Sequence, residues 1–189
     1  MSGQVARQDE VLAWIDLEMT GLDPERDVIV QLALVLTDWD LEPIGDPLEV
    51  TIWQPDSVLE RMEPYVRQMH QRSGLLDAIR ESEATVADAE RQAMGLLTEH
   101  AAYRKARLAG NSVGQDRRFL ARYMPQLDGY LHYRIVDVST VKELAQRWYG
   151  VTYTKPDDGR HTALADIQQS IEELRYYRQA IFKVVDAVD

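Results

Sequence analysis

The sequence predicts a single α/β domain in which an antiparallel meander of strands is followed by helices that alternate with short strands. Two observations support this: three apolar segments lie close together before residue 54, and the remainder shows helical periodicity broken by short apolar runs. The 189 residues suffice for one domain with a sizeable core but not comfortably for two. We expect a polar tail over 1–10, a domain over 11–182 and a second tail over 183–189.

Three strands are expected first. VLAWIDLE at 11–18 is apolar and runs into a turn signal at 21–24. VIVQLALVLTD at 28–38 is long and rich in β-branched residues, and a third segment covers 49–53. Because the connections are short, we expect these strands to be antiparallel neighbours.

Helices begin after residue 84. Thr85 and Asp88 resemble a capping box that opens a helix to about residue 102. A short strand at 108–109 leads into a helix over 115–124, which Pro125 stops.

The C-terminal third continues the alternation. A strand over 135–138 precedes a helix that Thr140 and Glu143 cap and that Gly150 closes. One long amphipathic helix then follows. Its apolar positions fall at helical spacing: Ala163, Ile167, Ile171, Leu174 and Ile181.

Composition narrows the function classes. Hydrophobic residues make up 45% and charged residues 28% of the chain, as in ordinary globular proteins. We expect neither a membrane span nor a signal segment, and a cytoplasmic location. The lack of cysteine excludes disulfides and thiolate chemistry. The net charge of -11 argues against long duplex nucleic acid, which basic surfaces bind, but is compatible with a short oligonucleotide.

Asp16 and Glu18 form the first acidic group. Two apart at the end of an apolar strand, their side chains project from the same face. Like charges repel unless a cation lies between them, and Mg²⁺ and Mn²⁺ prefer carboxylate oxygens. The D-x-E pattern is common, however, and on its own more often marks the solvated end of a strand.

Asp116 follows the small-residue stretch GNSVGQ at 110–115. A strand that ends in such a turn and opens a helix with an acidic residue often presents a ligand at the edge of a sheet. An ordinary helix start explains the same pattern, because an acidic first turn complements the helix dipole.

His161 and Asp166 form the third group. Five positions correspond to about 140° on an ideal helix, so we place His161 in the loop before the last helix and Asp166 in its second turn. A histidine there suits a general base, although a surface histidine near a solvated carboxylate is the alternative. His70, His100 and His132 show no comparable acidic constellation.

In this order, D-x-E, a central N-x₄-D and a C-terminal H-x₄-D resemble the three exonuclease motifs of the DEDD superfamily, in its histidine-bearing subclass. Three blocks resemble oligoribonucleases more closely: WIDLEMTGLD at 14–23, GNSVGQDRRFLARYMPQLDGYLHYRIVDVSTVKELAQRW at 110–148 and HTALADIQQSIEELRYYR at 161–178. The resemblance covers about 11–182. It implies a ribonuclease H-like mixed sheet flanked by helices.

The resemblance also implies a reaction. Family members are 3′–5′ exoribonucleases that release nucleoside 5′-monophosphates from very short RNAs, dinucleotides above all. Matched by motif, four carboxylates would hold two Mg²⁺ or Mn²⁺ ions: Asp16, Glu18, Asp116 and Asp166. Asp16 would bridge both ions, which stabilise the attacking and leaving oxygens, and His161 would accept the proton of the attacking water.

A subsite for the 5′ phosphate is implied at Arg134, Ser139 and Thr140, and Ser112 is implied to bind the substrate. The residues themselves add one argument, because a helix that opens at Ser139 and Thr140 offers unpaired N–H groups to an anion. Thr140 acting only as a helix cap is an equally good reading of the sequence.

The resemblance also implies which residues contact the bases and which reach a second subunit. Leu22 would lie between the two bases, and Tyr65 would stack on a base where relatives often have tryptophan. In a homodimer, Tyr133 and Arg134 would reach the partner subunit's site. TYTKPDDGRH at 152–161 departs from the family pattern, which puts the closure of His161 over the site in doubt.

Three other functions share parts of this pattern. A DNA-directed proofreading exonuclease shares the five motif residues but is not expected to contain HYRIVDVSTVKEL at 132–144. A non-catalytic nucleotide-binding module has no need of all five residues. A structural cation-binding protein leaves the position of His161 unexplained.

Overall fold

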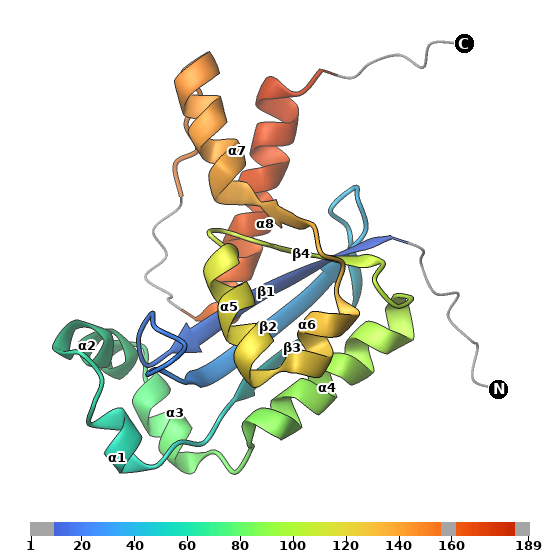
Figure 1. Ribbon diagram of the computed structural model, residues 1–189. Helices are drawn as coiled ribbons and strands as arrows, with labels where there is room; N and C mark the ends of the chain where they lie inside the picture. Colours follow the sequence, from blue (N-terminus) through green and yellow to red (C-terminus); the bar gives the residue numbers. More distant parts are fainter. Residues whose placement is uncertain (1–9, 156–161, 184–189) are drawn as a thin grey trace.

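A mixed sheet forms the centre of the protein. The computed structural model describes residues 10–155 and 162–183, and within them the five strands have the order β3-β2-β1-β4-β5 (Figure 1). The strands are β1 (Val11–Met19), β2 (Ile29–Thr37), β3 (Pro43–Thr51), β4 (Ala106–Gly110) and β5 (Ile135–Asp137). The helical segments are α1 (Asp56–Leu59), α2 (Pro64–Arg72), α3 (Leu75–Glu81), α4 (Val86–His100), α5 (Gly114–Tyr123), α6 (Pro125–Tyr130), α7 (Val138–Leu144), the π-helix η1 (Ala145–Tyr149) and α8 (Ala163–Ile181).

Strand pairing confirms the predicted α/β class and the order of its parts. β1, β2 and β3 form an antiparallel meander, in which Glu18 is paired with Gln31. β4 is parallel to β1, and β5 is parallel to β4. The C-terminal ends of β1, β4 and β5 therefore lie at the same edge of the sheet, which is where α/β proteins commonly place their sites.

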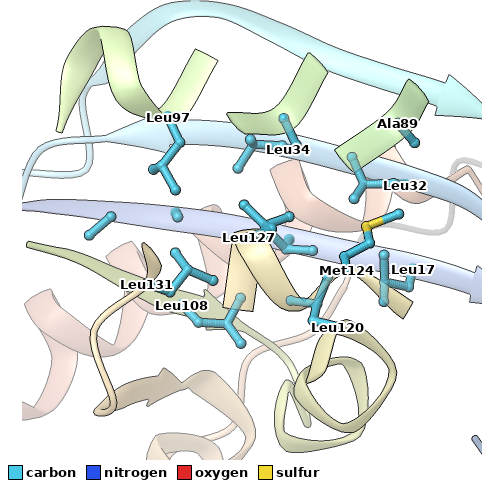
Figure 2. Close-up of a cluster of buried hydrophobic side chains, with 14 of the residues drawn as sticks. Leu17, Leu32, Leu34, Ala89, Leu97, Leu108, Leu120, Met124, Leu127 and Leu131 are labelled. Atoms are coloured by element: carbon cyan, nitrogen blue, oxygen red, sulfur yellow. The ribbon is translucent and has the colours of Figure 1, made fainter. Parts of the chain in front are cut away.

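Each face of the sheet is covered by helices. The larger core lies between the sheet and α4, α5 and α6. Figure 2 shows Leu97, Leu120 and Leu127 of these helices, and Met124 between α5 and α6, meeting the side chains of the strands. The opposite face is covered by α8, where Ile167 packs with the core of that side.

The alternation of β1 decides where its carboxylates lie. Ala13, Ile15 and Leu17 belong to the core beneath α4 to α6, whereas Leu12 and Trp14 belong to the core beneath α8. Because side chains alternate along a strand, the residues that continue the second series, at positions 16 and 18, lie on the face that α8 covers.

Residues 54–84, to which the sequence analysis assigned no element, contain α1, α2 and α3. These helices have four, nine and seven residues, too short for a clear periodic signal. They bury a small third cluster against Val30 that includes Leu59 and Ile79. The capping box of Thr85 and Asp88 is confirmed at the start of α4.

Pro125 does more than end a helix. α5 ends at Tyr123, one residue before the expected end, and Pro125 also begins α6, which the sequence did not suggest. Proline suits the first turn of a helix because its missing N–H needs no partner there. The buried carboxylate of Glu90 accepts the next two N–H groups, from Gln126 at 2.7 Å and Leu127 at 3.1 Å.

The expected cap of the next helix was wrong. α7 begins at Val138, and its N-cap is Asp137, which accepts the Ser139 N–H at 3.0 Å. Thr140 therefore lies inside the first turn, and Glu143 contacts Arg147 instead. The last turn widens into η1, which ends at Gly150 with φ +67°, as the sequence predicted.

Among residues 10–155 and 162–183, no helix combines the length and the apolar character that crossing a membrane requires.

Candidate active site

Three of the predicted carboxylates meet between β1 and α8. Asp16, Glu18 and Asp166 each offer a carboxylate oxygen, and these atoms lie within 4.8 Å of one another. The strand β1 supplies two of them from one face, and α8 crosses that face. Asp166 lies in the first turn of α8, whereas the sequence prediction placed it in the second turn. All three residues are half-buried.

Asp116 lies beside this cluster, in the first turn of α5. Its residue is only 7% exposed, and its Oδ1 accepts the N–H of Leu17 at 3.0 Å. Leu17 separates the two carboxylates of β1 in the sequence, so this hydrogen bond fixes the start of α5 to the strand at the centre of the site. The three-residue cluster that could hold a metal does not include Asp116.

Burial and mutual repulsion raise the pKa values of these acids. Burial, then Asp116, Glu18 and Asp166 raise the pKa of Asp16 to about 8, while Lys155 lowers it. Burial, Asp166 and Asp116 raise the pKa of Glu18 to about 7. Burial raises the pKa of Asp116 to about 7 against the backbone hydrogen bonds that lower it. The site thus concentrates negative charge where solvent stabilises it poorly.

This donor set fits a divalent cation. The donors are carboxylate oxygens alone, which hard cations such as Mg²⁺, Mn²⁺ and Ca²⁺ prefer. A cation among them would offset the repulsion that raises the pKa of Asp16. The geometry therefore supports divalent-metal binding without selecting one ion.

His70 has an acidic neighbour, Glu18, where the sequence predicted none. His70 lies on α2 and is only 1% exposed. Its Nε2 is 2.9 Å from the carbonyl oxygen of Met19, and its Nδ1 is 3.8 Å from Glu18 Oε2. Burial lowers its pKa, so the neutral imidazole is favoured. No local pattern could have revealed this contact, because 51 positions separate His70 from Met19.

The expected general base, His161, lies outside the described residues, as do the other residues of 156–161. The start of α8 is described: Thr162 is its N-cap and accepts the Ala165 N–H at 3.3 Å.

The two serines that were expected to bind the substrate lie together. Ser112 follows β4 with a left-handed φ of +51°, and its N–H donates to Asp137 Oδ1 and to Ser139 Oγ, both at 3.0 Å. The two hydroxyls are 3.1 Å apart. Because Asp137 caps α7 and accepts the Ser139 N–H, that N–H is not an unpaired donor for an anion.

Tyr133, Arg134 and Thr140 are exposed on the isolated chain. Tyr133 is 72% exposed and stacks on His132, with ring centroids 4.6 Å apart. The Arg134 guanidinium lies 5.4 Å from the centroid of the Tyr133 ring. The chain thus presents an aromatic ring and a cation together at its surface.

Leu22 and Tyr65 are exposed apolar residues, at 71% and 76%. The loop of Leu22 follows β1 directly, and its carbonyl accepts a hydrogen bond from Gln115 Nε2. Tyr65 lies on α2, which His70 ties to the end of the same strand. Both residues therefore belong to segments that are anchored near the carboxylates.

Comparison with known sequences identifies close relatives. The chain matches the exonuclease family RNase_T over residues 13–174. It is 52% identical to an oligoribonuclease of Streptomyces griseus over 90% of this chain and 86% of that one. It is 45% identical to an oligoribonuclease of Azoarcus sp. (strain BH72), over 95% of this chain and all of the other.

Solved structures share the fold. Exonuclease I from Methylocaldum szegediense has a TM-score of 0.68 and 22% identity, covering 91% of this chain and 41% of its own. E. coli Exonuclease I in complex with a 5cy-dT13 oligonucleotide has a TM-score of 0.69 and 19% identity, covering 92% and 41%. The chain spans about two fifths of these larger proteins, so the likeness confirms a ribonuclease H-like fold alone.

Proposed function

This chain belongs to the oligoribonuclease family of exonucleases and is a 3′–5′ exoribonuclease of short RNA, and we propose that its main substrates are 5′-phosphorylated dinucleotides. The observation that carries this proposal is the cluster of Asp16, Glu18 and Asp166 on a chain about half identical to oligoribonucleases. The products would be nucleoside 5′-monophosphates.

Four carboxylates would hold two divalent cations, Mg²⁺ or Mn²⁺: Asp16, Glu18, Asp116 and Asp166. When bound, two such cations stabilise the attacking and the leaving oxygen of an in-line displacement. Asp16 is the residue proposed to serve both cations, as the family resemblance implies, and its carboxylate lies within 4.8 Å of those of Glu18 and Asp166. Asp116 would contribute while its Oδ1 keeps the hydrogen bond from Leu17.

His161 is the proposed general base. It stands one residue before the N-cap of α8 in the sequence, close along the chain to Asp166. As a neutral imidazole near neutral pH, it would accept the proton of the water that attacks the 3′-terminal phosphodiester.

Length selection would come from residues that hold the two ends of a dinucleotide. Ser112, Ser139, Thr140 and Arg134 would contact the 5′ phosphate. An arginine guanidinium offers several donors to phosphate oxygens. The exposed apolar side chain of Leu22 would lie between the bases.

Tyr65 would stack on one base, a contact worth ~1–3 kcal/mol per base.

We also propose a homodimer in the cytoplasm, in which Tyr133 and Arg134 complete the partner subunit's site. Their exposure on the isolated chain is compatible with such a contact.

The test is turnover of 5′-phosphorylated RNAs of two, five and twenty nucleotides, with Mg²⁺, with Mn²⁺ and with EDTA. We expect cleavage that needs the metal and is fastest on the dinucleotide. Faster cleavage of the twenty-nucleotide RNA would overturn the substrate proposal but not the catalytic centre. A preference for long single-stranded DNA would favour a proofreading-type enzyme.

A further inference from the structure

Asn111 follows β4 directly and uses its whole amide group in hydrogen bonds. Its Nδ2 donates to Ser170 Oγ at 2.8 Å and to Glu173 Oε2 at 3.2 Å, both on α8. Its Oδ1 accepts from Ser139 Oγ, on α7, at 3.0 Å. One side chain therefore bridges the helix that carries Asp166 and the helix that carries the expected phosphate subsite.

Glu173 fixes which way this amide points. It is fully buried, and its Oε1 lies 3.6 Å from Lys142 Nζ and 3.4 Å from the Tyr177 hydroxyl. A carboxylate only accepts hydrogen bonds, so the Asn111 Nδ2 must face Glu173. A flipped amide would place two acceptors against each other at a buried site.

The fixed amide in turn fixes the serines. Ser170 Oγ donates its proton to the carbonyl oxygen of Asp166 at 2.8 Å and accepts from Asn111. Ser139 has a single hydroxyl proton, which it gives to Asn111 Oδ1. Its oxygen then accepts from the Ser112 N–H at 3.0 Å and from the Ser112 hydroxyl at 3.1 Å.

We propose that Asn111 and Glu173 are positioning residues that hold the 5′-phosphate subsite of Ser112 and Ser139 at a set distance from the metal ligand Asp166. This inference rests on the proposed function, since it concerns the same substrate. Neither residue is proposed to touch the dinucleotide. They act through Ser139 on one side and through Ser170 on the other, so they set the length of substrate that spans the phosphate subsite and the carboxylates.

Asp137 does not replace this connection. It accepts the N–H groups of both Ser112 and Ser139, which ties the two serines to each other at the start of α7. The hydrogen bonds of Asn111 link that group to α8, whose first turn carries Asp166.

The test exchanges the charges of the pair. Asn111→Asp sets two carboxylates against each other, Glu173→Gln keeps an acceptor for Asn111, and the double variant restores one amide facing one carboxylate. Each is assayed for kcat and KM on a dinucleotide with and without a 5′ phosphate. We expect Asn111→Asp to raise KM for the phosphorylated dinucleotide about tenfold, with little change for the unphosphorylated one.

The double variant decides the question. We expect it to recover KM to within about threefold of the wild type, since the pair regains its complementarity. Glu172→Gln is the matched control, because Glu172 precedes Glu173 on α8 but is exposed and contacts Arg175. It should leave both substrates unaffected.

Three results would overturn the inference: equal losses on both dinucleotides, no recovery in the double variant, or the same loss in Glu172→Gln. If Asn111→Asp does not fold, Ser170→Ala breaks the link to Asp166 with less disturbance and should raise the same KM about threefold. Failure of the proposed function is distinct, because the wild-type enzyme would then not prefer the phosphorylated dinucleotide.

Discussion

At the residue scale, the charge of Asp16 is expected to lower the stability of the folded chain while being required for turnover. Burial and three neighbouring carboxylates raise its pKa to about 8, so above that pH its charge is repelled by the others. Asp16→Asn removes the charge and keeps the shape. We expect it to abolish turnover yet to raise the melting temperature in EDTA at pH 9 by about 2–4 °C, which corresponds to about 1 kcal/mol in a chain of this size.

Thermal unfolding and a turnover assay of the same samples check this prediction. Asp46→Asn, on the exposed side of β3, is the control and should change neither quantity. A less stable Asp16→Asn protein would mean that the carboxylate is held by contacts that outweigh its repulsion.

The pKa values of the site predict a linkage between pH and metal binding. The pKa values of Asp16, Glu18 and Asp116, about 8, 7 and 7, lie above their ordinary values of 3.8, 4.5 and 3.8. The folded chain therefore binds protons that the unfolded chain has released, and this stabilisation, present at acid pH, is lost as pH rises through 7 to 8. Metal binding needs the deprotonated carboxylates.

We thus expect the melting temperature in EDTA to fall between pH 5 and pH 9. The rise in melting temperature that Mn²⁺ causes should become larger over the same range. Differential scanning calorimetry at several pH values, with EDTA and with Mn²⁺, checks this. If the rise caused by Mn²⁺ does not depend on pH, these acids are not the ligands.

Sequence patterns could predict the carboxylates but not the histidine that meets them. Asp16 and Glu18 follow from the period of two along a strand, and Asp166 from the helix that the apolar spacing of its neighbours predicts. His70 contacts Met19 across 51 positions. Only the docking of α2 creates this contact, and no local periodicity encodes that docking.

At the element scale, His70 anchors α2 to the end of β1. His70→Ala removes the 2.9 Å hydrogen bond to the Met19 carbonyl and leaves a cavity, at a cost of about 2 kcal/mol. Because Tyr65 lies on the same helix, we expect faster hydrogen exchange over Pro64–Arg72 and a higher KM for the dinucleotide. Arg72 is exposed on the same helix, so Arg72→Ala is the control. If both variants change hydrogen exchange and KM to the same extent, the prediction is wrong.

Helix ends were harder to predict than helices. The sequence indicated α8 through apolar positions at helical spacing, α4 through its capping box, and α5 through the small-residue turn before it and the proline after it. The cap of α7 was misassigned to Thr140, since Asp137 reads equally well as the last residue of a strand. α6 depends on the distant carboxylate of Glu90, and a partner on another helix leaves no mark in the local sequence.

At the scale of the whole molecule, the order of strands explains how the site forms. The antiparallel meander fixes the face of β1, and the parallel β4 and β5 bring Asp116 and the pair of Ser112 and Ser139 to the same edge. The resemblance in motifs could predict this architecture because its first block falls on β1, its second runs from the end of β4 through α7, and its third falls on α8. The order of strands does not determine how subunits assemble.

Complementation between inactive subunits tests how they assemble. If Arg134 completes the partner subunit's site, an Asp16→Asn subunit can lend its arginine to an Arg134→Ala subunit whose carboxylates are intact. Each variant alone should be nearly inactive on 5′-phosphorylated dinucleotides. Subunits mixed equally and allowed to exchange should regain about a quarter of wild-type turnover, because half of the dimers are mixed and each holds one complete site. Mixtures no more active than the sum of their parts would place Arg134 at its own subunit's site or outside any site.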